Sequence, residues 1–332
     1  MATFTKNCPQ QIPITFKNDN LTVSITTFDF KEQLLSLLHD PLLVQNLSML
    51  DVPQDNPFNK FIPPDGRLSC FNSRKWYQKA WNYCCQQTND WMCPIIFGCD
   101  ETLVGSHLGR KGITPLTFTL SIFSEELRNK SSSWRFLGFI YDLDIYGKRL
   151  VTTGPNNNQQ KRYQTVEEKS AKFHKVLRQV LDSYIQVQQN GGILNHQLTL
   201  GTVTKIVNIK VPCGLILGDM QGGDKHCGSC VSYSYSLNRL CRQCNVSGRE
   251  SGNPNIQCSR MSMTLIKQYV QNNELENLNL ISQYNVHVAW FDVDFGGCKY
   301  GIFSAAMPVE ALHLVEGGLI KDVLDILFAY DL

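Results

Sequence analysis

Lys210-Val-Pro-Cys-Gly-Leu-Ile-Leu-Gly-Asp219 is a short apolar run that ends in an aspartate, and Cys93-Pro-Ile-Ile-Phe-Gly-Cys-Asp100 shows the same arrangement earlier in the chain. Short apolar runs bounded by Gly and Pro are typical of strands buried inside a sheet, although periodicity alone does not separate them from buried helix. A carboxylate directly after such a strand is fixed at the rim of the sheet. Two carboxylates held in this way can share Mg²⁺ ions through their oxygen atoms, as two-metal phosphodiester chemistry requires.

The composition indicates a mainly globular chain. With 332 residues, 42% of them hydrophobic and 18% charged, the chain can bury a full core. The net charge of +2 neither predicts nor excludes a nucleic-acid binder, because a local basic face is enough for binding. The N-terminal residues lack the apolar segment of a signal peptide, and no apolar stretch reaches the roughly 20 residues that span a bilayer. We therefore expect a protein of the nucleus or another part of the cell interior, neither secreted nor bound to a membrane.

Residues 1–90 are expected to form a mostly helical N-terminal region of unknown role. An amphipathic helix is predicted around residues 31–47, and a Pro-rich break follows at residues 53–64. The aromatic segment at residues 76–83 is predicted to be a helix whose hydrophobic face packs on the next domain.

Residues 91–225 are predicted to form an α/β core with a mixed sheet. The expected strands are residues 93–104, 116–124, 134–144, 205–210 and 211–218. Turn residues at 109–115 join the first two strands, the first three strands make an antiparallel meander, and the last two form a pair. A polar linker at 152–160 leads into a helix at 165–189, which ends at Gly191-Gly192. Three antiparallel strands, a helix and a further strand are the element order of an RNase H-like sheet.

Asp100 and Asp219 are the leading candidates for metal ligands and catalytic residues. In the RNase H-like order the first and fourth strands lie side by side, so these two carboxylates would face each other and share Mg²⁺ or Mn²⁺. Asp142 and Asp144, at the end of the third strand, are rivals by the same logic, although surface turn residues are the simpler interpretation. Asp224 could also approach a metal, but a helix N-cap is the simpler role for it.

The cysteines suggest a zinc site. There are thirteen, an odd number with several in apolar runs, which does not indicate a disulfide framework. The motifs Cys227-Gly-Ser-Cys230 and Cys241-Arg-Gln-Cys244 are separated by ten residues, a spacing that permits a tetrahedral Cys₄ zinc site. Free thiols in loops are the alternative, which is disfavoured because exposed thiols without a partner are reactive. His226 and His313 are alternative ligands, and a site that uses Cys241, Cys244 and His313 would tie the cluster to the C-terminal helix.

A basic stripe runs along the helix at 165–189. Its members, Lys169, Lys172, Lys175 and Arg178, recur every third residue on one face. The stripe could contact phosphates, but a solvated face is the simpler interpretation.

Residues 217–228, followed by residues 239–245, resemble the second-aspartate region of DDE-type transposases of the CACTA and Plavaka kind. Those proteins carry Gly-Asp at the end of a strand and a Cys-x-x-Cys motif some twenty residues later. The stretches that resemble their first-aspartate region are residues 97–102, 115–123, 128–129 and 134–139. Residues 306–318 are similar to their Pro-acidic-x-x-x-His segment, and the whole resemblance covers residues 93–332.

The resemblance implies an RNase H-like nuclease core that cuts and joins DNA, with Asp100 and Asp219 as ligands of two Mg²⁺ ions. One ion would activate the attacking water or 3′-hydroxyl, and the other would stabilise the leaving oxygen. In related nucleases with an inserted zinc site, histidines complete the Cys-x-x-Cys motif. This pattern favours Cys241, Cys244 and His313 as the zinc ligands here.

The third catalytic acid of the family lies on a helix downstream of the histidine segment. Glu310 and Glu316 belong to the histidine segment in the resemblance, so we assign neither of them as that acid. We therefore expect the catalytic triad to be incomplete within these residues.

These observations predict four regions and one leading function. The regions are residues 1–90, the RNase H-like core at 91–225, a zinc-knuckle insertion at 226–300 and the start of a C-terminal helical segment at 301–332. The leading function is that of a transposase-derived DNA-binding protein, which, if active, is a Mg²⁺-dependent transposase or nuclease of mobile-element origin. The alternative is a non-catalytic, zinc-containing relic or domesticated module that binds nucleic acid or protein, and a thiol redox protein is a weaker third hypothesis. DNA is the expected partner, and self-association into a homo-oligomer stays open.

Overall fold

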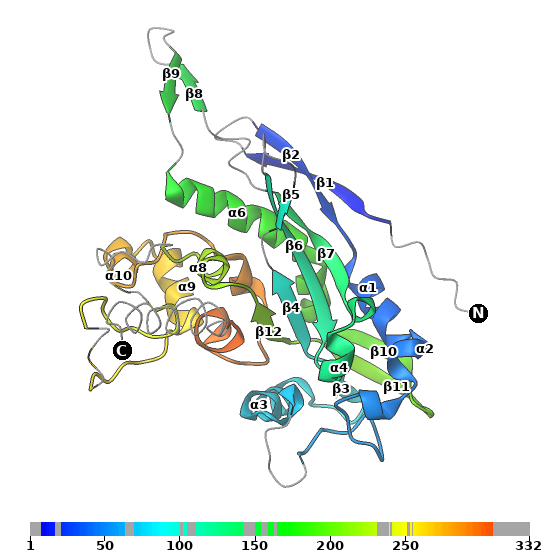
Figure 1. Ribbon diagram of the computed structural model, residues 1–332. Helices are drawn as coiled ribbons and strands as arrows, with labels where there is room; N and C mark the ends of the chain where they lie inside the picture. Colours follow the sequence, from blue (N-terminus) through cyan, green and yellow to red (C-terminus); the bar gives the residue numbers. More distant parts are fainter. Residues whose placement is uncertain are drawn as a thin grey trace, which may run out of the picture.

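Seven strands form a mixed sheet through the middle of this α/β protein (Figure 1). The computed structural model describes residues 8–16, 21–63, 70–99, 102–104, 111–141, 150–153, 159–162, 165–230, 239, 241–250, 253 and 255–307. The strands of the sheet are β1 (Gln10–Phe16), β2 (Leu21–Thr27), β4 (Ile95–Cys99), β5 (Thr102–Val104), β6 (Lys111–Leu120), β7 (Arg135–Tyr141) and β12 (Cys213–Leu217). Their order is β1-β2-β7-β6-β4-β12, and β5 pairs with β6 outside this path.

The expected antiparallel meander is confirmed as β4, β6 and β7, and β12 joins β4 in parallel. Two boundaries differ from the prediction. The single strand expected at residues 93–104 is divided into β4 and β5, with residues 100–101 outside the described part. The turn predicted at residues 109–115 is wrong, because β6 begins at Lys111 and its first residues pair with β5 and β7. Pairing on both sides outweighs the local turn propensity of this stretch.

A second sheet holds β3 (Asp90–Met92), β10 (Ile193–Leu200) and β11 (Val203–Lys210) in the order β10-β11-β3. The predicted pairing of residues 205–210 with residues 211–218 is wrong, because β11 pairs with β3 whereas β12 pairs with β4. The Ile95 amide donates to the Pro212 carbonyl (2.9 Å), so parallel pairing continues from one sheet into the other. β10 has no counterpart among the expected strands, because its middle residues are polar.

β8 (Leu150–Thr153) and β9 (Gln159–Arg162) form an antiparallel hairpin that projects from the rest of the molecule (Figure 1). The polar linker predicted at residues 152–160 is therefore wrong at both ends, where its residues belong to paired strands. Strand pairing here joins residues that are close in sequence, which is the least costly way to form a ladder.

Helices flank the sheets. They are α1 (Phe30–Leu38), α2 (Pro41–Val44), α3 (Lys75–Cys84), α4 (Glu125–Arg128), α6 (Val166–Val180), α7 (Asp182–Gln189), α8 (Met220–Cys227), α9 (Met263–Gln271) and α10 (Leu275–Leu280). The helix predicted at residues 165–189 is confirmed as α6 and α7, with a local break at Leu181. Thr165 and Glu168 form a reciprocal capping box that fixes where α6 begins.

The N-terminal region contributes both helices and strands. α3 confirms the aromatic helix, whereas the helix expected around residues 31–47 ends at Leu38 because Pro41 begins α2. β1 and β2 form a hairpin, and Thr27 of β2 pairs with Gly138 of β7. The described part of residues 1–90 therefore adds a hairpin to the large sheet besides its helices.

One hydrophobic core joins the N-terminal region, the sheet and the segment before residue 300. The ring of Tyr184 in α7 lies edge-on to Phe30 of α1 (centroids 4.7 Å apart) and to Phe97 of β4 (5.1 Å). The ring of Phe97 also contacts that of Trp290, in the short helix Ala289–Asp292, with the two ring centroids 5.5 Å apart. All four rings are fully buried, and burial of such a side chain stabilises the fold by roughly 1.5–3 kcal/mol. The regions expected from the sequence thus share one core.

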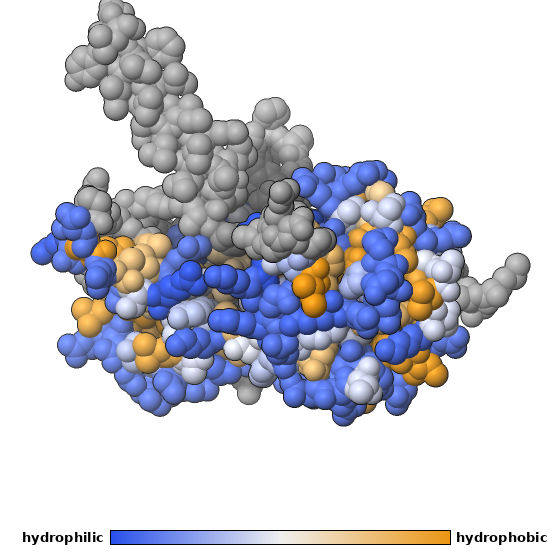
Figure 2. All heavy atoms as spheres, turned by 90° about the horizontal axis from the view of Figure 1, so that it is seen from below, coloured by the Kyte–Doolittle hydropathy of each residue, from blue (hydrophilic) through white to orange (hydrophobic). Residues whose placement is uncertain are grey.

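The described surface seen in Figure 2 is mainly hydrophilic, and its apolar residues lie in separate patches. Exposed apolar side chains such as Leu42, Ile62 and Ile206 come from different elements. Scattered apolar residues of this kind need no partner. No helix among the described residues has both the length and the apolar character required to cross a membrane.

Candidate functional site

The carboxyl ends of β4 and β12 meet at one rim of the large sheet. Leu217 of β12 is in register with Gly98 of β4, and the Cys99 thiol donates to the Leu217 carbonyl (3.2 Å between heavy atoms). Gly218 comes so close to β4 that a Cβ there would lie 2.8 Å from the Cys99 carbonyl oxygen. The prediction that the strands leading to Asp100 and Asp219 lie side by side is therefore confirmed.

Asp219 lies just after the end of β12, where it is the N-cap of α8. Its Oδ1 accepts a hydrogen bond from the Gly222 amide, and its backbone is extended (φ −67°, ψ 176°). An aspartate at an N-cap satisfies one of the free amides of the helix and lies at the positive end of the helix dipole. The half-buried carboxylate is therefore held in a fixed orientation beside the end of β12.

Asp100 follows Cys99 directly in the sequence and lies outside the described residues. Several other predicted residues also lie outside them: Asp142, Asp144, Glu310, His313 and Glu316. Of the two leading aspartates, the described structure therefore places Asp219 itself, together with the strand end that leads to Asp100.

Asp224 lies inside α8, not at its start. The N-cap role predicted for it is wrong, because Asp219 caps this helix. Asp224 is buried and accepts a hydrogen bond from Nη1 of Arg242 (3.3 Å). Burial raises the pKa of the Asp224 carboxyl, and Arg242 acts in the opposite direction. Because Arg242 lies between Cys241 and Cys244, this ion pair ties α8 to the loop of the second Cys-x-x-Cys motif.

The two Cys-x-x-Cys motifs have different surroundings. Cys227 is buried at the end of α8, where burial raises the pKa of its thiol to about 12. Cys230 is half-buried and hydrogen-bonds the side chain of Tyr284. Within the described ranges, no group of three or more Cys, His, Asp or Glu side chains is arranged to hold a metal ion. The described structure thus does not bring the four cysteines into the predicted Cys₄ site.

A further thiol, that of Cys258, lies beside the loop of Cys241 and Cys244. The Cys244 side chain makes hydrogen bonds with the thiols of both Cys241 and Cys258. Burial raises the pKa of Cys244 to about 11, and the two neighbouring thiols act in the same direction. Cys258 belongs to no Cys-x-x-Cys motif, so the available sequence signal was only its position in the same polar segment.

His226, an alternative zinc ligand, is held by aromatic residues. Its Nδ1 accepts a hydrogen bond from Nε1 of Trp290 (3.2 Å), and its ring lies edge-on to Phe173 (5.2 Å). Nearby, Nδ1 of His174 accepts from the Ala289 amide (3.3 Å). Burial lowers the pKa of both histidines to about 3, so both are neutral at physiological pH. They join α6 and α8 to the segment that carries Trp290.

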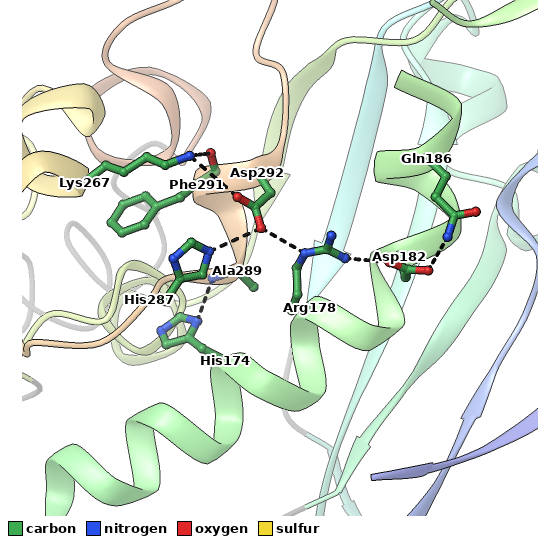
Figure 3. A network of polar contacts seen from close by, with 9 residues as sticks. All are labelled: His174, Arg178, Asp182, Gln186, Lys267, His287, Ala289, Phe291 and Asp292. Carbon is green, nitrogen blue, oxygen red and sulfur yellow. Dashed lines mark hydrogen bonds and ion pairs between the residues drawn. The ribbon is translucent and has the colours of Figure 1, made fainter. Parts of the chain in front are cut away.

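Arg178, at the end of the basic stripe, takes part in a polar network between α6 and the segment after α9 (Figure 3). Its Nε donates to Asp292 (2.9 Å) and its Nη1 to Asp182 (2.8 Å). Nε2 of His287 and Nζ of Lys267 also approach Asp292, at 3.2 and 3.6 Å. The hydrogen bonds from His287 and then Arg178 hold the pKa of Asp292 well below its usual range, against the effect of burial. Arg178 is therefore a structural residue in this arrangement.

Two lysines of the stripe contact β1. The ammonium groups of Lys172 and Lys175 lie over the ring of Phe16, at 5.5 and 5.1 Å from its centroid. Lys175 also donates to the Thr15 carbonyl (2.7 Å). Lys172, Lys175 and Arg178 thus make contacts within the chain, while Lys169 and Lys175 are also exposed to solvent.

No protein-family model matches the chain. The comparison with curated proteins gives no match either. The geometry of the sheet rim and of the cysteine loop therefore carries the functional argument.

Proposed function

We propose that this chain is a transposase-derived, RNase H-like DNA-binding protein whose sheet rim binds Mg²⁺ or Mn²⁺ through Asp100 and Asp219. The observation that carries the proposal is the parallel pairing of β4 with β12 at the edge of the β4-β6-β7 meander. Along the chain the meander is followed by β8 and β9, then α6 and α7, then β10 and β11, and finally β12. Apart from these two strand pairs, which lie in other sheets, this is the element order expected for an RNase H-like core. This pairing supports a shared site for the two aspartates because each follows the end of one of the paired strands.

The residues at the rim suit a hard divalent cation. Carboxylate oxygens are the ligands that Mg²⁺ prefers, and such sites use one or two of them together with water and substrate phosphate. The cap hydrogen bond from Gly222 restrains Asp219, so this ligand loses little side-chain freedom when it binds. Bound Mg²⁺ would supply activation of the attacking oxygen and neutralise charge on the leaving oxygen. Asp100 and Asp219 would position both functions at the scissile phosphate.

A zinc site in the loop of Cys241 and Cys244 belongs to the same proposal. The resemblance implies His313 as a further ligand, and the ion pair between Arg242 and Asp224 supports a link from this loop to α8. Zinc binding would then stabilise the helix that Asp219 caps. DNA as the substrate rests on the resemblance.

The non-catalytic alternative also has one observation in its favour. Asp219 caps α8, and this structural role alone is a sufficient reason for an aspartate at that position. In that case the chain would be a relic or a domesticated module that binds nucleic acid or protein through zinc and surface charges. The two functions differ in whether the charge of Asp219 is needed.

Asp219→Asn separates the two roles. Asparagine caps helices as well as aspartate does, whereas it removes the charge that a metal ligand needs. We expect the variant to keep its melting temperature and to lose the Mg²⁺- or Mn²⁺-dependent nicking of supercoiled DNA that the unmodified protein shows. Asp29→Asn is the matched control, because Asp29 caps α1 by accepting from the Glu32 amide (2.9 Å). Equal nicking by both variants, or no metal-dependent nicking by the unmodified protein, would exclude the catalytic proposal.

A further inference from the structure

The loop of Cys241 and Cys244 presents both sulfur atoms to backbone amides. The Gln243 amide donates to Sγ of Cys241 (3.4 Å), and the Val246 amide donates to Sγ of Cys244. In each case the donor lies two residues after the cysteine, so one local turn is repeated.

The segment that follows Cys258 is hydrogen-bonded to this loop. The Asn245 amide donates to the Ser259 carbonyl (3.0 Å), and the Ser259 amide donates back to Oδ1 of Asn245 (2.8 Å). The bridge between Cys244 and Arg260 continues this pairing. Cys258 precedes the pairing by one residue, which explains why its thiol reaches Cys244.

Two other cysteines of the paired motifs, Cys227 and Cys230, make contacts outside this loop. Cys227 is fully buried in the main core, and Cys230 hydrogen-bonds Tyr284. Cys258, in contrast, is exposed, and Cys241 and Cys244 are half-buried. Zinc could therefore reach these three thiols without unfolding the core.

We propose that Cys258 is a ligand of the zinc site, so that Cys241, Cys244 and Cys258 supply three thiolates. The three side chains are not yet arranged around one point. Cys241 and Cys258 each contact Cys244, so metal binding would require these side chains to rearrange around one ion. Each thiol releases one proton to solvent as its bond to Zn²⁺ forms, which makes three protons for each ion, and no oxidation takes place. A fourth ligand would complete the tetrahedral site.

This inference rests on the zinc part of the proposed function and is independent of Asp219. Co²⁺ replaces Zn²⁺ in such sites, and its absorption in the near ultraviolet grows with each bound thiolate. We expect Cys258→Ser to lose about one third of this absorption, from three thiolates to two, and to release two protons for each ion instead of three. Loss of a residue that hydrogen-bonds a metal ligand lowers metal affinity roughly 10–100-fold. Loss of the ligand Cys258 itself should lower the Zn²⁺ affinity by at least this factor. Cys230→Ser is the matched control and should keep all three properties.

A second measurement needs no variant. Zn²⁺ should protect Cys258 from alkylation by iodoacetamide in the reduced full chain, as read by mass spectrometry of its peptides. Equal labelling of Cys258 with and without Zn²⁺, or a Cys258→Ser variant with unchanged absorption and affinity, would overturn the proposal. No Co²⁺ binding by the unmodified protein would overturn the zinc site as a whole. Nicking that depends on Asp219 would survive either result, so a failure here is distinguishable from failure of the nuclease proposal.

Discussion

Replacing His174 and His226 together by asparagine should remove much of the sensitivity of this protein to mild acid. Both rings are buried, and each uses Nδ1 to accept a hydrogen bond, from the Ala289 amide and from Nε1 of Trp290 respectively. The Oδ1 atom of asparagine occupies a position similar to Nδ1 and can accept the same hydrogen bond. The double variant therefore loses two titratable groups while it keeps both acceptors.

The magnitude follows from proton linkage. The pKa of each histidine is about 3 in the folded protein and about 6.5 in the unfolded chain. Between these values only the unfolded chain binds the protons, so the free energy of unfolding falls as the pH falls. From pH 7 to pH 5.5 the loss is about 1.3 kcal/mol for each histidine and about 2.5 kcal/mol for both. The stabilisation is thus complete above about pH 7 and is lost progressively toward pH 3.

Urea unfolding followed by tryptophan fluorescence at several pH values between 7 and 5.5 measures this loss. The unmodified protein should lose about 2.5 kcal/mol more than the double variant over this range. The single variants His174→Asn and His226→Asn are the controls, and each should remove about half of this loss, about 1.3 kcal/mol. Equal pH dependence in the unmodified protein and the double variant would refute the reasoning, whatever their absolute stabilities.

Two further substitutions test the packing around this core. Asp292→Asn should lower the free energy of unfolding by about 1–2 kcal/mol near neutral pH, because a partly exposed carboxylate loses its charged hydrogen bonds to Arg178 and His287. A double-mutant cycle with Arg178→Gln that gives no coupling energy would contradict the interaction between Asp292 and Arg178. Gly138→Ala should destabilise the fold by about 1–3 kcal/mol, because the added methyl would lie 2.7 Å from Cγ1 of Val180 and 2.9 Å from the Thr26 carbonyl. An unchanged melting temperature would contradict the close approach of β2 to β7.

The sequence predicted the elements that carry strong local signals. β4 and β12 are apolar runs with Gly and Pro at their ends, and α6 begins with a capping box at Thr165 and Glu168. The element order was also sufficient to predict that β12 lies beside β4. These features are decided by residues close together in the chain, or by a topology with few alternatives.

Long-range contacts decide the features that the sequence did not predict. β11 pairs with β3, whose residues lie more than 100 positions earlier, and so enters a different sheet from β12. β1 has mainly exposed side chains, so its apolar signal is weak. Cys258 meets Cys244 only because the chain folds back after residue 250, and no spacing rule for paired cysteines includes it. Local sequence patterns do not predict contacts of this kind.

The most direct test of the shared metal site at the rim of β4 and β12 is affinity cleavage of the protein backbone. Fe²⁺ replaces Mg²⁺ at sites of oxygen ligands, and with peroxide it cuts the nearby chain, so mass spectrometry of the fragments locates the ion. We predict cuts around residues 99–101 and around residues 218–220 together, which excess Mg²⁺ suppresses and Asp219→Asn abolishes. Cuts at only one of the two places, or an unchanged pattern in the variant, would contradict a metal site shared by the two strand ends.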